Sequence, residues 1–111
     1  MDLPRVSLFP MIEAAEPLRK RAPAVDENGR ALSDFMVIIP GLRKRPDMTI
    51  QRTMYDIHRI LSGFGDKVVF AEFNVALNLL WVSIRPVTGM RDEIARALRN
   101  SIPDARLVSH I

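Results

Sequence analysis

Two basic tripeptides are the residues of this chain best suited to binding chemistry. The first covers residues 19–21, the second is Arg43, Lys44 and Arg45, and each follows a leucine and precedes a proline within two residues. Such cations in a loop can neutralise phosphate groups, and the planar guanidinium fork suits paired oxygens. Arg43, Lys44 and Arg45 are therefore the candidate anion-binding residues. The alternative is ordinary solvated loop charge in an arginine-rich chain with a net charge of +3.

The sequence contains no recognisable catalytic or metal-binding motif. It has no cysteine, which excludes disulfides, thiolate metal sites and a cysteine nucleophile. The two histidines, His58 and His110, lack the companion ligands that a metal site needs. No serine lies in a Gly-x-Ser-x-Gly motif, and no glycine stretch has the spacing of a phosphate loop. We predict no catalytic residues, no metal and no cofactor, while scattered residues could still form an enzyme.

The order of apolar segments in residues 35–111 predicts a small α+β domain. The apolar run from Phe35 to Ile39 ends at a Pro-Gly pair, which is typical of a buried strand. From Ile50 to Phe64, apolar residues recur at spacings of four and three, which indicates one face of a helix. The remaining expected elements are strands over residues 67–73, 77–85 and 105–111, and a helix between Thr88 and Pro103. Asp47 and Thr88 are the expected N-caps.

This βαββαβ order predicts a ferredoxin-like two-layer sandwich over residues 35–111. Right-handed crossovers place both helices on one face of a four-stranded antiparallel sheet. The element order resembles that of the RNA-recognition motif, a family that stacks bases on aromatic side chains of its sheet. Trp81 is the only aromatic residue on the third expected strand. Base recognition is therefore not carried over to this chain.

The third expected strand is apolar on both of its faces. Leu77, Leu79 and Trp81 occupy one face, and aliphatic residues occupy alternate positions from Leu80 to Ile84. The helices of a sandwich cover only one sheet face, and a solvated antiparallel face normally carries polar residues. An open apolar face marks an interaction site. We predict that Leu77, Leu79 and Trp81 form an interface with a second copy of the chain, with the N-terminal segment or a ligand as alternative covers.

Residues 1–34 differ from the rest of the chain and are expected to form an N-terminal arm outside the sheet. They hold four of the eight prolines, which remove backbone donors and favour extended backbone before each proline. Residues 26–30, Asp-Glu-Asn-Gly-Arg, have the composition of a turn. The start of the chain lacks the features of a secretory signal, and the apolar stretch 68–84 is too short for a membrane helix. We expect a cytoplasmic protein without membrane contact.

Three functions are compatible with these patterns. The favoured one is a small non-enzymatic interaction or regulatory module that self-associates through its open sheet face as a homo-oligomer, or binds another protein there. The second is a basic domain that binds an anionic partner such as nucleic acid through Arg43, Lys44 and Arg45. The third is a small enzyme or metabolite-binding domain. Salt separates the first two, because phosphate contacts weaken steeply as salt rises.

Overall fold

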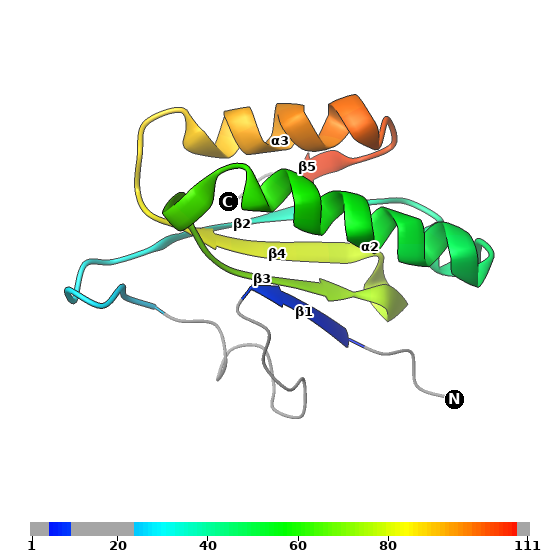
Figure 1. Ribbon diagram of the computed structural model, residues 1–111, viewed down its shortest axis with the longest axis horizontal. Helices are drawn as coiled ribbons and strands as arrows, with labels where there is room; N and C mark the ends of the chain where they lie inside the picture. The colour runs from blue at the N-terminus through cyan, green and yellow to red at the C-terminus, as the bar shows by residue number, and fades with distance from the viewer. Residues whose placement is uncertain (1–4, 10–23, 109–111) are drawn as a thin grey trace.

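The computed structural model describes residues 5–9 and 24–108, which form a layer of two helices on one β-sheet (Figure 1). The strands are β1 (Arg5–Phe9), β2 (Ser33–Ile38), β3 (Val68–Asn74), β4 (Leu79–Ile84) and β5 (Arg106–Val108). The helices are α2 (Asp47–Ser62) and α3 (Met90–Ser101), with single 3-10 turns at η1 (Leu42–Lys44), η2 (Gly65–Lys67) and η3 (Val75–Leu77). The α+β class predicted from the sequence is confirmed.

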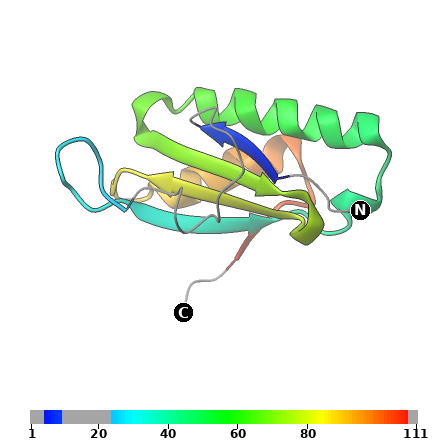
Figure 2. The ribbon, with the colours of Figure 1, turned by 90° about the horizontal axis from the view of Figure 1, so that it is seen from below.

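The five strands lie in the order β1-β3-β4-β2-β5, and every neighbouring pair is antiparallel. β2 to β5 correspond to the four strands expected from the sequence, and β2 and β4 are the inner pair among these four. Both helices lie on the same side of the sheet, as Figure 1 and the perpendicular view in Figure 2 show. Among the described residues, no helix lies against the opposite side, which we call the distal face.

β1 is a fifth strand, which corrects the expectation that residues 1–34 form an arm outside a four-stranded sheet. It pairs with the outer edge of β3, with Phe9 opposite Ala71. The expectation rested on the high proline content of this segment. However, Pro4 and Pro10 only flank the five strand residues, so every backbone N–H donor between them is intact. A five-residue segment with intact donors can complete an exposed strand edge. Residues 1–4 and 10–23 of the expected arm lie outside the described residues.

The hydrophobic core lies between the helices and the sheet. α2 contributes Ile57 and Leu61 to it, as the spacing of apolar residues predicted, and α3 contributes Ile94 and Leu98. The buried strand residues that meet these helices include Phe35, Val37, Phe73, Leu80, Val82 and Ile84. Residues at alternate positions of the same strands must therefore lie on the distal face.

The starts of both helices differ from the expected caps. The N-cap of α2 is Pro46 and the N-cap of α3 is Gly89, and neither start has a side-chain cap hydrogen bond. Gly89 adopts a left-handed φ of 78°, which glycine tolerates without a steric penalty. Asp47 is instead the first helical residue, where its charge still favours the positive end of the helix dipole. Thr88 precedes the cap of α3.

Candidate functional site

Two rows of mainly apolar residues run across the distal face of the sheet. In the first row, Met36 of β2 lies between Val108 of β5 and Trp81 of β4. In the second row, Ile38 pairs with Leu79 on one side and with Arg106 on the other. The five apolar residues, Met36, Ile38, Leu79, Trp81 and Val108, are all partly exposed. This distal-face patch spans three neighbouring strands.

Polar side chains are buried beside this patch. Glu72 lies opposite Trp81, and Ser83, which is 0 % exposed, lies opposite Phe70. Within residues 5–9 and 24–108, neither Trp81 Nε1 nor Ser83 Oγ has a hydrogen-bond partner, although both atoms are buried. Leaving a buried polar atom without a partner costs about 1–3 kcal/mol. The part of the distal face around Glu72 and Ser83 is therefore enclosed within the chain, unlike the patch itself.

The three predicted interface residues do not all lie on the same element. Leu79 and Trp81 belong to β4 and to the distal-face patch, whereas Leu77 is the last residue of η3 and is 58 % exposed. The expected strand from residue 77 therefore begins at Leu79. Asn78 causes the difference, because it adopts a left-handed φ of 54° and turns the chain between η3 and β4.

Sequence reasoning missed the neighbours of Leu79 and Trp81 in the patch. Met36 and Ile38 lie in an uninterrupted apolar run, and an apolar strand with no polar alternation is apolar on both faces. That run was the pattern that could have identified them. Val108 could not be assigned to this face until the pairing of β5 with β2 was known.

The predicted anion-binding residues contact separate parts of the fold. Arg43 donates through Nη1 to the carbonyl oxygen of Ala76 at 3.2 Å. Arg45 Nη2 forms an ion pair with Asp104 Oδ2 at 2.9 Å, after the end of α3. Lys44 is exposed and has no ion pair within the described ranges. The structure does not bring the three cations together around one point.

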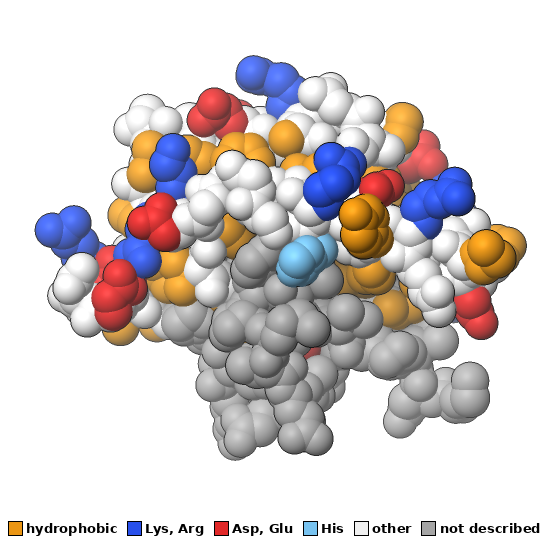
Figure 3. Space-filling model, in the orientation of Figure 1, with side chains coloured by type: hydrophobic (Ala, Val, Ile, Leu, Met, Phe, Trp, Pro, Cys, Tyr) orange, Lys and Arg blue, Asp and Glu red, His pale blue; other side chains and the backbone are white. Residues whose placement is uncertain are grey.

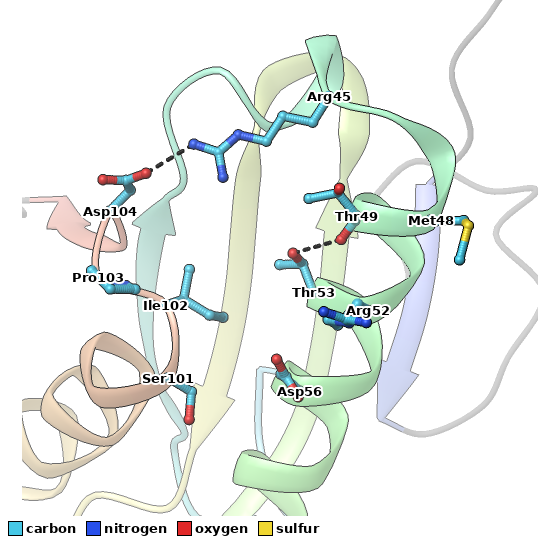
Figure 4. A pocket seen from close by; sticks show the side chains of 10 residues that line it. All are labelled: Arg45, Met48, Thr49, Arg52, Thr53, Asp56, Ser101, Ile102, Pro103 and Asp104. Atoms are coloured by element: carbon cyan, nitrogen blue, oxygen red, sulfur yellow. Dashed lines mark hydrogen bonds and ion pairs between the residues drawn. The ribbon is translucent and has the colours of Figure 1, made fainter.

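Arg45 instead lies at the edge of a pocket between the start of α2 and the end of α3 (Figure 4). The pocket has a volume of ≈ 290 Å³. Its lining comprises Arg45, Met48, Thr49, Arg52, Thr53, Asp56, Ser101, Ile102, Pro103 and Asp104. It therefore combines charged groups of both signs, hydroxyl groups and an apolar surface from two separate segments of the chain.

A second charged cluster holds the turn before β2 against the end of β4. Arg85 Nη1 lies 2.9 Å from Asp26 Oδ2, and Arg85 Nη2 lies 2.9 Å from Glu27 Oε1. Arg85 Nε also donates to the carbonyl oxygen of Asp66 at 2.8 Å. One guanidinium thus joins three segments, and sequence reasoning gave Arg85 no role. Nothing in the local pattern around it indicates this contact.

The turn predicted over residues 26–30 is present, and the Asp26 carboxylate holds it. Asp26 Oδ1 accepts the backbone N–H groups of Arg30 at 2.9 Å and Asn28 at 2.8 Å. The bond from Arg30 is the main reason that the pKa of Asp26 lies below its usual value. The backbone N–H of Glu27, followed by the hydrogen bond from Arg85, likewise lowers the pKa of the Glu27 carboxyl. This cluster is a structural anchor.

The remaining candidates add no further site. In the part of the chain that the structure describes, no group of three His, Asp or Glu residues is placed to hold a metal ion. His58 lies on the exposed side of α2, and His110 is outside the described residues. No described helix is both long and apolar enough to span a bilayer. Comparisons with protein-family models, curated proteins and solved structures found no match to this chain.

Proposed function

We propose that this protein is a small non-enzymatic interaction or regulatory module that self-associates through the distal face of its sheet. The observation that carries this proposal is the patch of Met36, Ile38, Leu79, Trp81 and Val108, which is apolar, partly exposed and opposite to both helices. Contiguous exposed apolar surface of this kind favours contact with another protein surface. A second copy of the chain is the simplest occupant, because it presents the same surface in return.

We also propose that the fold is ferredoxin-like. Two features support this assignment: the order β3-β4-β2-β5 with antiparallel neighbours, and one helix after each of the inner strands β2 and β4. In this arrangement the helices occupy one layer and the sheet the other. The side of the sheet that no described helix covers is then the distal face, and the patch on it is the surface assigned to self-association.

The layout of the distal face resembles that of a stable interface. Polar residues lie around the apolar patch, with Asp34 and Asn74 at strand ends and Arg106 on β5. An apolar centre with a polar rim is the usual organisation of such contacts, which bury about 800 Å² on each partner. Trp81 lies within the apolar part, and buried aromatic residues often dominate binding energy. Trp81 is therefore the expected energetic centre.

The indole N–H of Trp81 allows the apolar part of this contact to be tested separately. Trp81 Nε1 is buried and lacks a partner among the described residues, so a facing surface does not reach it. A Trp81→Phe substitution keeps most of the apolar surface and removes the N–H group. It should therefore leave self-association largely intact.

Light scattering on matched variants tests the proposal. The double substitution Leu79→Ser with Trp81→Glu should convert a wild-type dimer to a monomer while circular dichroism remains unchanged. The matched control is Val87→Ser with Tyr55→Glu, which makes the same types of change at exposed positions outside the patch. The control should remain dimeric. A dimer that survives the change at Leu79 and Trp81 would place the interface elsewhere.

The alternative function, binding of nucleic acid or another anionic partner through the basic tripeptide, has weaker support. Arg43 and Arg45 already bind Ala76 and Asp104 within the chain. Basic and acidic side chains are also interspersed over the surface seen in Figure 3 and do not gather into one basic patch. Binding along a phosphate backbone requires several cations on one surface.

A further inference from the structure

Two arginines and two aspartates line the pocket between α2 and the end of α3, and one of these arginines has no ion pair among the described residues. Arg45 Nη2 lies 2.9 Å from Asp104 Oδ2, and Arg59 Nη2 lies 3.7 Å from Asp56 Oδ1. Each carboxylate at the pocket therefore has its own cation. Arg52 lines the same pocket and forms no ion pair within the described ranges. Its guanidinium group remains available to an anion.

Hydroxyl groups beside this charge can donate to the same anion. Ser101 Oγ accepts a hydrogen bond of 3.5 Å from Arg59 Nη2, which leaves its own proton available. Thr49 lies across the pocket and presents a second hydroxyl group (Figure 4).

The size and the apolar part of the pocket restrict the ligand. Met48, Ile102 and Pro103 contribute apolar surface beside the charged groups (Figure 4). The volume of ≈ 290 Å³ is at the lower limit of small-molecule sites, which span roughly 300–1,000 Å³. We propose that this pocket binds a phosphate monoester of a small molecule, with the phosphate on Arg52 and the organic group against Ile102.

Arg45 is the second phosphate ligand in this arrangement. Its ion pair with Asp104 is exposed, with 43 % and 57 % of the two side chains accessible. Only Nη2 of this guanidinium contacts Asp104, so its remaining N–H donors are available to a bound dianion while the ion pair is kept. The guanidinium groups of Arg45, directly after η1, and Arg52, on α2, then bind one phosphate through charge-assisted hydrogen bonds. Of the three basic residues predicted from the sequence, only Arg45 lies at this pocket.

Titration of the full chain with inorganic phosphate, followed by amide NMR at constant ionic strength, tests the site. We expect saturable shifts at Thr49, Thr53 and Ser101 with a Kd of about 1 mM. Arg52→Gln should weaken binding about tenfold, since it removes a charge-assisted contact. Arg96→Gln is the matched control, because it removes an equal charge from an exposed position of α3 outside the pocket and should leave the Kd unchanged.

A second probe tests the organic part of the ligand. Ethyl phosphate should bind more tightly than inorganic phosphate, because its ethyl group contacts apolar surface. Equal or weaker binding of the ester would contradict the assignment to phosphate esters. The absence of saturable shifts with phosphate, shifts confined to other residues, or an unchanged Kd in Arg52→Gln would each overturn the site. None of these outcomes bears on self-association, which is assigned to the opposite side of the sheet.

Discussion

Replacing Leu98 by alanine tests how tightly α3 packs on the sheet. Leu98 is 1 % exposed and belongs to the core cluster between the helices and the sheet. Alanine has a high helix propensity, so any loss in the free energy of unfolding reports the packing of the side chain and not a weaker helix. Three buried carbons are removed, and at about 0.8 kcal/mol for each the transfer loss is about 2.4 kcal/mol. A residual cavity adds about 24 cal/mol per Å³, which gives a total loss of about 2–5 kcal/mol.

Urea unfolding followed by circular dichroism measures this loss. The protein concentration must be equal for all variants, because self-association links stability to concentration. Leu77→Ala is the matched control, since it is the same substitution at a residue that is 58 % exposed. The control should change the free energy of unfolding by less than about 0.5 kcal/mol. A loss of similarly small size for Leu98→Ala would refute the packing of α3 described here.

Two turns and the N-terminal segment give three further predictions. The hydrogen bond from the Arg30 N–H lowers the pKa of Asp26, so the turn should stay closed through the usual carboxyl range and open as pH falls through the lowered pKa. A loss of protection at the Arg30 amide, measured relative to its intrinsic exchange rate at each pH, would report the opening. Asn78→Ala should lower the free energy of unfolding in urea by about 2 kcal/mol, because alanine is strained in the left-handed backbone and cannot accept the 2.7 Å hydrogen bond from the Arg43 N–H. Asn78→Gly should lose only the hydrogen bond, because glycine tolerates this backbone conformation. Deletion of residues 1–30 should leave the domain folded by circular dichroism, because the described core cluster begins at Phe35; an unfolded product would make β1 or the turn essential.

Local sequence patterns were sufficient to predict the helices and the inner strands. The spacing of Ile57 and Leu61 follows the helical period, so these residues identify the buried side of α2 without knowledge of their partners. Alternation likewise groups Leu80 and Val82 on one face of β4, and the structure shows that this face meets the helices. Such predictions succeed because the period of the backbone alone determines which residues share a face.

Features that depend on distant contacts were not predictable from local patterns. The start of β4 depends on Asn78, whose side chain accepts the N–H of Arg43 at a separation of 35 residues. The phosphate pocket joins Arg45 to Asp104 across 59 residues. β1 likewise acquires its role from the free edge of β3, which lies far along the chain. Local propensity carries no information about such pairings.

The mass of the full chain in solution tests self-association most directly. Sedimentation equilibrium at about 100 µM should give twice the chain mass, which requires a dissociation constant well below this concentration. Dilution should return the mass to that of one chain and shift the emission of Trp81, the only tryptophan, to longer wavelength as the distal face meets water. A single-chain mass at about 100 µM would contradict the proposed function.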